Sequence, residues 1–166
     1  LVADAQLIRD QVANCKEILY QMAADAGEHL GEAMEEYTAE EILAKTVDSL
    51  PVETYKRIEV ENEAETLSIL VPLRTLVRSI KGLINNCLYG SMPESRVVAR
   101  CYADQEFLYF GVEDQGMGMD ETILARAHEP FFTSKEPGKG MGLGLFLAQN
   151  VAESFGGKLA IISEPG

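Results

Sequence analysis

The chain has 166 residues, of which 46% are apolar, so it is long enough for one domain with a buried core and an additional element. Its formal net charge of −13 argues against a nucleic-acid partner, because phosphate neutralisation requires clustered Lys and Arg. No apolar run reaches the roughly 18 residues that suggest a membrane-spanning helix. The three cysteines show neither metal-ligand nor disulfide spacing, which fits a reducing cytosol.

Residues 1–26 are predicted to form one long helix with an apolar seam. The apolar positions recur in alternating steps of four and three, which is typical of a helical bundle or coiled coil. They are Leu1, Ala5, Ile8, Val12, Cys15, Leu19 and Met22. One helix cannot bury this seam alone, so it needs partner helices. Residues 27–37 are rich in Gly, Glu and Ala and are predicted to be a linker.

The segment 38–71 is predicted to contain a helix followed by two strands. Thr38 and Glu41 have the spacing of an N-terminal capping box, and Pro51 marks the end of the helix. Residues 55–60 and 66–71 alternate between apolar and polar side chains, which is typical of half-buried strands.

A second helix is predicted from Pro72 onward, followed by a hairpin of two strands. Apolar residues at helical spacing form the buried stripe of this helix, and Asn86 lies near its end. The alternating segments 96–103 and 106–113 are predicted to be the two strands. The second strand places Asp114 at a strand end, where ligand contacts commonly lie.

Two glycine clusters and an aromatic pair lie in the last third of the chain. Residues 114–118 read D-Q-G-M-G, residues 129–135 read E-P-F-F-T-S-K, and residues 138–145 read G-K-G-M-G-L-G-L. A helix from Gly142 and a strand over residues 158–163 are predicted to follow. Glycine lets backbone N–H groups approach a ligand closely, and a helix N-terminus behind glycines is a good seat for phosphate. The spacing matches neither a P-loop nor the G-x-G-x-x-G pattern.

In this order, the three motifs resemble the first glycine box, the F box and the second glycine box of sensor histidine kinases, and residues 83–87 resemble their N box. The resemblance covers roughly residues 50–166. It implies the Bergerat (GHKL) ATP-binding fold, an α/β two-layer sandwich with a mixed sheet covered by helices on one face. It also implies ATP and Mg²⁺ as cofactors. The domain is expected at residues 38–166, and the family has a further strand beyond residue 163.

The resemblance also assigns roles to individual residues. Asp114 corresponds to the aspartate that reads the adenine amino group, and Asn86 to the asparagine that ligates Mg²⁺. Thr133 to Lys139 corresponds to a lid over the nucleotide. The expected nucleotide-binding residues are Asn86, Asp114, Gly116, Gly118, Phe132, Lys135, Lys139, Gly140, Gly142, Leu143, Gly144 and Leu145.

In the resembled family, residues 1–26 correspond to the second helix of the dimerisation and phosphotransfer hairpin. The first helix, which carries the phosphorylated histidine, is expected before Leu1, since neither His29 nor His128 has the required context. The resemblance implies a homodimer, phosphate transfer from ATP to that histidine, and relay to a response regulator. The chain alone is not expected to autophosphorylate. It is expected to be the cytoplasmic portion of a bacterial inner-membrane protein, without membrane contact of its own.

Residues 11–19 read Q-V-A-N-C-K-E-I-L and resemble a stretch of the RegB, PrrB and RoxS group of redox-responsive sensor kinases. In that group the cysteine at the position of Cys15 is linked to redox control. Lys16 favours the thiolate form modestly. The alternative is that Cys15 is a small apolar residue of the helical seam. The sequence leaves both interpretations open.

Gly82 stands where the family usually has the first N-box asparagine and where its ATPase relatives have a glutamate base. It disfavours an ATPase of the gyrase or MutL type, and the helical seam with the F box disfavours a serine kinase such as an anti-sigma factor. It also predicts the loss of one phosphate or metal contact. A nucleotide-binding module with weakened or no catalysis therefore stays open. Tyr89 is a further departure, at a position where the family frequently has lysine or aspartate.

Overall fold

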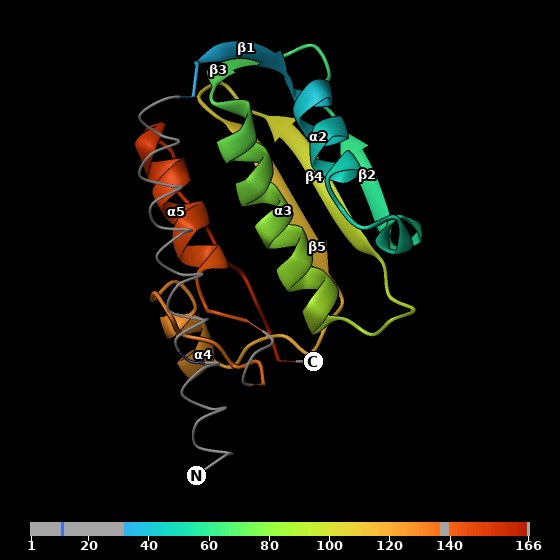
Figure 1. Ribbon diagram of the computed structural model, residues 1–166, viewed down its shortest axis with the longest axis vertical. Coiled ribbons are helices and arrows are strands. Elements are labelled where there is room, and N and C mark those ends of the chain that lie inside the picture. Colours follow the sequence, from blue (N-terminus) through green and yellow to red (C-terminus); the bar gives the residue numbers. More distant parts are fainter. Residues whose placement is uncertain (1–10, 12–31, 137–139, 166) are drawn as a thin grey trace. The chain divides into compact units, whose positions relative to one another are not determined.

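The computed structural model of the protein describes residues 11, 32–136 and 140–165 (Figure 1). The chain divides into two units, Leu1–Ala33 and Met34–Gly166. The helix predicted over residues 1–26 falls, apart from one residue, outside the described residues, and so does Cys15. All helices and strands discussed below belong to the second unit.

The second unit combines helices with a small antiparallel sheet and a mixed sheet. Its elements are β1 (Glu35–Thr38), α2 (Ala39–Asp48), the 3₁₀ helix η1 (Val52–Arg57), β2 (Ile58–Asn62), β3 (Ser68–Val71), α3 (Leu73–Gly90), β4 (Val97–Ala103), β5 (Leu108–Asp114), α4 (Glu121–Arg126) and α5 (Gly144–Ser154). Strand β1 pairs antiparallel with β3, so the sheet begins inside the range expected as linker. The other sheet has the order β2-β4-β5, with β2 parallel and β5 antiparallel to β4. The predicted mixed sheet is confirmed.

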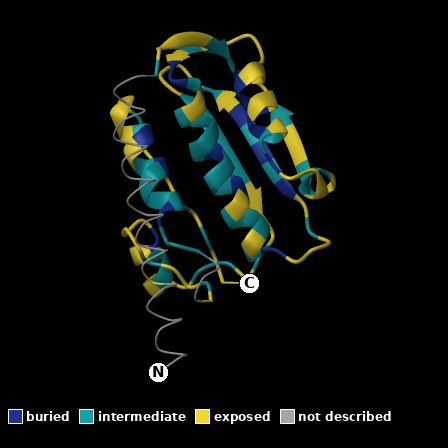
Figure 2. Cartoon of the chain, viewed as in Figure 1, coloured by how far each residue is buried: buried dark blue, intermediate teal, exposed yellow. Residues whose placement is uncertain are grey.

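Helices α2 and α3 lie across one face of the mixed sheet, and α5 packs alongside α3 (Figure 1). The core lies between these helices and the sheet, where the buried residues concentrate (Figure 2). Ile42 of α2, Ile84 of α3 and Val97 of β4 are completely buried there. The two-layer α/β arrangement predicted from the sequence is therefore confirmed.

Helix α3 is held by its apolar stripe and by the loop that follows it. Ile80 and Ile84 are buried, and partly buried leucines of the same helix pack on the same cluster. Arg57 donates to the carbonyl oxygens of Met92 at 2.7 Å and Ser95 at 3.1 Å, which fixes the chain after the helix. Among the described residues no helix combines the length and apolar character needed to cross a bilayer.

The capping box at the start of α2 is confirmed. The Thr38 hydroxyl accepts a hydrogen bond from the Glu41 N–H at 3.2 Å, and the Glu41 carboxylate accepts one from the Thr38 N–H at 2.9 Å. Two of the donors that a helix N-terminus leaves unpaired are thereby satisfied. The bond from the Thr38 backbone is the main reason why the pKa of Glu41 is lowered.

Two strand predictions are wrong in detail. The strand predicted over residues 55–60 begins only at Ile58, because η1 occupies the preceding residues. The Pro51 carbonyl accepts from both the N–H (2.9 Å) and the hydroxyl (2.7 Å) of Thr54, which closes a helical turn directly after the proline. No strand forms in the described residues 158–165, where the Met119 N–H instead donates to the Ser163 hydroxyl at 2.9 Å.

Candidate functional site

The C-terminal half of α3 carries the polar side chains around which the candidate site is built. Ile84 anchors this half in the core and is completely buried. Asn86 and Tyr89 are three residues apart, a spacing that places side chains side by side on a helix surface. Asn86 is partly buried, whereas the Tyr89 side chain is 48% exposed. Each of the two clusters described below forms against this part of the helix.

The first cluster joins Asn86 to Lys135 and to the second glycine-rich segment. The Lys135 ammonium donates to the amide oxygen of Asn86 at 2.9 Å. A Cβ atom on Gly144 would lie 3.1 Å from the Asn86 amide nitrogen, and one on Gly140 would lie 2.7 Å from the Lys135 side chain. The glycines therefore let the backbone pass against both side chains. Burial in this cluster lowers the pKa of Lys135.

The N-terminus of α5 belongs to the same cluster. The first residue of α5 is Gly144. The residue before it, Leu143, is the N-cap and has no side chain that could accept a hydrogen bond from the helix N–H groups. The first intrahelical bond runs from the Leu147 N–H to the Leu143 carbonyl at 2.9 Å, so the N–H groups of the first turn have no partner within the helix. These donors and the helix dipole give the cluster a positive potential next to the Asn86 oxygen, which suits an anion.

The second cluster surrounds the carboxylate of Asp114 at the end of β5. Its Oδ1 atom accepts from the Gly116 N–H at 2.8 Å and lies 3.3 Å from the Ser91 hydroxyl oxygen. That hydroxyl also donates to the Cys87 carbonyl at 2.7 Å. Burial, followed by the bond to Asp114, raises the pKa of the Cys87 thiol. Asp114 itself is exposed, so its carboxylate is oriented by the protein and open to a ligand.

The first glycine cluster packs against the end of α3. The Met117 N–H donates to the Gly90 carbonyl at 3.2 Å, and a Cβ atom on Gly116 would lie 2.5 Å from the same oxygen. Gly118 has a φ of +62°, and a Cβ atom there would lie 1.9 Å from the Glu164 carbonyl oxygen. Larger residues at either position would displace the loop from Asp114.

The F-box segment folds back onto the second glycine cluster. The Phe131 N–H donates to the Gly142 carbonyl at 2.9 Å, and both residues have positive φ angles, 67° and 68°. The Phe132 ring is partly buried beneath the Arg126 guanidinium, which lies 4.2 Å from the ring centroid. This turn brings Lys135 back to α3.

The structure brings together some of the sequence-predicted residues and leaves others apart. The first cluster gathers Asn86, Lys135, Gly140 and Gly144; the second joins Asp114 to Gly116. Gly142 and Phe132 support the first cluster from the F-box turn, Leu143 and Leu145 flank the start of α5, and Gly118 packs on the chain end. Lys139 lies outside the described residues, whereas His128 is described and exposed.

Sequence reasoning missed the roles of three residues in this region. Tyr89 lies under Lys135, whose ammonium is 4.4 Å from the ring centroid. Ser91 contacts Asp114, and Arg126 covers Phe132. The three-residue step from Asn86 to Tyr89 is a local signal for the first of these contacts. The other two depend on how distant segments meet, for which the sequence has no signal.

The first cluster fits a divalent cation shared with phosphates. The amide oxygen of Asn86 already accepts from a cationic group, the Lys135 ammonium, so this oxygen is accessible to a cation. In the described part of the chain no three His, Cys, Asp or Glu side chains converge as a metal site. A magnesium ion with one protein oxygen would complete its shell with phosphate oxygens and water, as Mg²⁺ commonly does.

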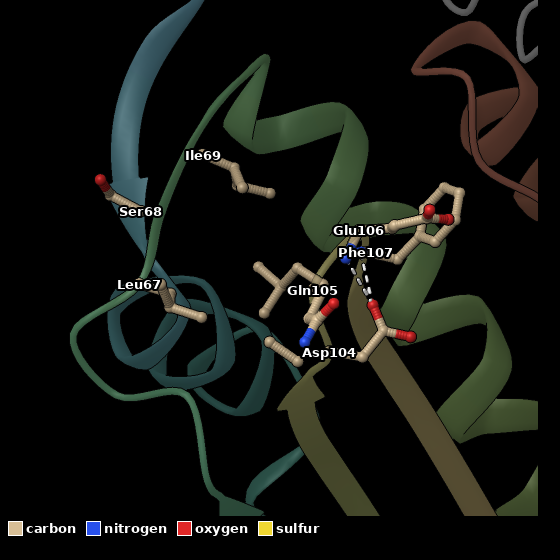
Figure 3. Close-up of a pocket in the computed structure, with 9 residues that line it drawn as sticks. Leu67, Ser68, Ile69, Asp104, Gln105, Glu106 and Phe107 are labelled. Atoms are coloured by element: carbon tan, nitrogen blue, oxygen red, sulfur yellow. Dashed lines mark hydrogen bonds between the residues drawn. The ribbon is translucent and has the colours of Figure 1, made fainter.

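Two surface hollows lie away from both clusters. One of about 170 Å³ is lined by residues 67–69 and 103–108 (Figure 3). The Asp104 carboxylate in its lining accepts from the N–H groups of Glu106 and Phe107 at 2.8 Å and from the Tyr109 hydroxyl at 2.7 Å, and these bonds lower the pKa of Asp104. Asp104 therefore stabilises the β4–β5 turn. The other hollow, of about 350 Å³, lies between α2 and β2.

Comparisons with known proteins agree with this geometry. Residues 73–166 match the family model for histidine kinase-, DNA gyrase B- and HSP90-like ATPases. The chain is 39% identical over 89 residues to the C4-dicarboxylate transport sensor protein DctB of Pseudomonas aeruginosa, across 51% of this chain and 14% of DctB. It is 40% identical over 76 residues to the sensor protein kinase FleS of the same species, across 46% of this chain and 19% of FleS.

A solved structure supports the fold. The mycobacterial sensor histidine kinase MprB superposes with a TM-score of 0.62 at 23% identity, over 74% of this chain and 80% of that one. The chain thus covers most of the MprB structure, whereas it spans only a small part of the length of DctB and FleS.

We predict that Gly116→Ala loosens the loop after β5. A methyl group 2.5 Å from the Gly90 carbonyl must push the loop away, which we expect to lower the free energy of unfolding by about 1–3 kcal/mol. Gly82→Ala is the matched control, because no atom lies within 4 Å of a Cβ atom there, and alanine in a helix should stabilise by about 0.5–1 kcal/mol. Urea unfolding measures both; equal effects at the two positions would contradict the packing described for Gly116.

Proposed function

We propose that the chain transfers the γ-phosphate of ATP to a histidine of a dimerisation hairpin. This proposal starts from its family: the chain belongs to the histidine kinase-, DNA gyrase B- and HSP90-like ATPases, as an ATP-binding catalytic domain of the sensor histidine kinase type. The phosphate is then relayed to an aspartate of a response regulator. In this proposal residues 1–26 are the second helix of the hairpin and form the homodimer. Residues 27–37, the last of which already belong to β1, lead into the catalytic domain, in the bacterial cytoplasm beneath an inner-membrane sensor.

The observation that carries the proposal is the uncapped N-terminus of α5 next to Asn86 and Lys135. Three groups that attract either an anion or a cation meet there: the N–H groups of the first turn, which no N-cap side chain satisfies in the described part of the chain, the Lys135 ammonium and the Asn86 amide oxygen. A polyphosphate accepts hydrogen bonds from the first two and shares a metal with the third. Asp114 contacts Cys87, the residue after Asn86, and can accept a hydrogen bond from the amino group of an adenine. A nucleoside triphosphate satisfies both clusters.

Phosphoryl transfer depends on positioning and charge neutralisation more than on covalent chemistry by the protein. Asp114 orients the base, the N–H groups of Gly144 and Leu145 hold phosphate oxygens, and Asn86 holds one side of the metal. When bound, Mg²⁺ neutralises the phosphates. Lys135 and Lys139 add cations from the lid segment, and Phe132 fixes that segment under Arg126. The other glycines, Gly116, Gly118, Gly140 and Gly142, let the backbone approach.

Two other functions compete with this proposal. A gyrase- or MutL-type ATPase needs a base to activate water, and the corresponding position is Gly82, around whose Cβ position the described residues place no atom within 4 Å. A non-catalytic nucleotide-binding module remains compatible with the same glycine, because the position supplies no second polar contact. Nucleotide binding and phosphate transfer therefore need separate tests.

We also propose that Cys15 makes the kinase redox-responsive, as in the RegB, PrrB and RoxS group. Its sequence neighbourhood supports this, although Cys15 lies outside the described residues. The two described cysteines are poor thiolates: burial raises the pKa of Cys101 to about 11 and, with Asp114 nearby, raises that of Cys87. If one thiol of this chain responds to oxidants at neutral pH, it is therefore Cys15.

Asp114→Asn should weaken ADP binding about 10- to 100-fold, because a charge-assisted hydrogen bond to the adenine amino group contributes roughly 1.5–3 kcal/mol. The Asn oxygen can still accept from the Gly116 N–H, so the loop should keep its shape. Calorimetric titration with ADP and Mg²⁺ measures the change. Asp104→Asn, in the turn at the other end of β5, is the matched control and should bind as the parent does. An absence of heat with the parent chain would refute nucleotide binding.

The chain should not become phosphorylated by labelled Mg-ATP when incubated alone. A separately produced hairpin that carries an acceptor histidine should acquire the label when it is mixed with this chain, since the chain provides the nucleotide site and not the acceptor. The same hairpin with His→Gln is the control. Binding of ADP without transfer to any hairpin would favour the non-catalytic module, and label on this chain alone would contradict the assignment of the acceptor.

Thiol labelling with Ellman's reagent at pH 7 should show one fast thiol in the native protein, and Cys15→Ser should remove it. Cys87 and Cys101 should react only after unfolding, because their raised pKa values keep them protonated. A fast thiol that persists in Cys15→Ser would refute this assignment. Oxidation should also change the rate of phosphate transfer to the hairpin in the parent and leave Cys15→Ser unaffected.

A further inference from the structure

The Lys135 side chain lies in a defined position against helix α3. Its ammonium donates to the Asn86 amide oxygen at 2.9 Å and lies 4.4 Å from the centroid of the Tyr89 ring. Its methylene chain passes Gly140 so closely that a Cβ atom on Gly140 would lie 2.7 Å from it. Three separate contacts therefore fix the Lys135 side chain, whereas the contacts of an exposed lysine usually contribute little to stability.

The position of the ammonium coincides with the expected metal position. The Asn86 oxygen is the ligand that the first cluster, as far as it is described, is expected to offer to Mg²⁺, and the ammonium already uses it. An ammonium and a divalent cation on one oxygen repel each other strongly at such short range. A bound metal would therefore displace the ammonium from Asn86 and replace it as the cation that neutralises the polyphosphate.

Tyr89 provides the surface on which the ammonium rests. The face of an aromatic ring attracts a cation through its quadrupole, and this attraction needs neither the hydroxyl group nor a charge on the ring. Tyr89 follows Asn86 by three residues, so one helix turn supplies both the amide oxygen and the ring. The ring is half exposed, and this contact gives it a role that core packing does not.

We propose that Lys135, held on Tyr89, is a built-in cation of the metal site that neutralises the bound polyphosphate when Mg²⁺ is absent and gives up the Asn86 oxygen when Mg²⁺ binds. Tyr89 is in this view a positioning residue. The inference rests on the proposed nucleotide site. It adds a statement that this site alone does not require, namely how strongly nucleotide affinity depends on Mg²⁺. It predicts that the chain binds ADP with less dependence on Mg²⁺ than it would without Lys135.

The test compares the dissociation constant for ADP in EDTA with that in saturating Mg²⁺ by calorimetry. Lys135→Met should raise the ratio of the two constants roughly tenfold, because the charge-assisted contact to phosphate is lost in EDTA while the metal still binds Asn86. Tyr89→Leu should raise the ratio in the same direction by a smaller factor. Lys135→Arg and Tyr89→Phe keep the cation and the ring face, and should restore a ratio near that of the parent.

Lys45→Met, on the exposed surface of α2, is the matched control, since it removes the same charge away from the cluster. If Lys135→Met alters the ratio by no more than Lys45→Met does, the inference is refuted, while ADP binding by the parent keeps the nucleotide site intact. If the parent binds no ADP in either buffer, the proposed function fails and takes the inference with it. Equal ratios for Tyr89→Leu and Tyr89→Phe would remove Tyr89 alone from the proposal.

Discussion

The burial of one face of α3 is the constraint on which the rest of the structure depends. Ile80 and Ile84 bind the helix to the core, and the bonds from Arg57 to the following loop prevent its end from shifting. The positions of Asn86 and Cys87 are thereby fixed together. Asn86 receives Lys135, and Cys87 contacts Asp114. The distance between the first cluster and the Asp114 carboxylate is therefore set by adjacent residues of one rigid element.

Local chemistry explains which parts of the fold could be predicted from the sequence. The capping box at Thr38 and the apolar stripe of α3 depend on residues within a few positions of one another, and both predictions are confirmed. The prediction of a strand at Tyr55 is wrong because alternation does not account for the turn that Pro51 initiates through Thr54. Residues 158–163 alternate as a strand should, but a strand also requires a partner, which no local pattern supplies.

The candidate site shows the same division between local and distant signals. The glycine spacing predicted close approach of the backbone to a ligand, which stays a prediction; in the structure Gly116, Gly140 and Gly144 lie against side chains of the two clusters. The sequence did not distinguish Lys135 from Lys139, since both are cations of the same short segment, and Lys139 lies outside the described residues. The F-box turn, in which Phe131 bonds to Gly142, carries Lys135 across 49 residues of sequence to Asn86.

The negative net charge of the chain makes positive groups close to the candidate site important for binding a polyphosphate. A chain of charge −13 repels a nucleotide polyphosphate at long range, but that repulsion is screened beyond roughly 8–10 Å at physiological ionic strength. Within that distance nearby groups decide the sign of the potential, and the described residues contribute the N–H donors at the start of α5 and the ammonium of Lys135. We therefore expect Lys135, in contact with Tyr89 and Asn86, to affect affinity for phosphate more than an exposed lysine would.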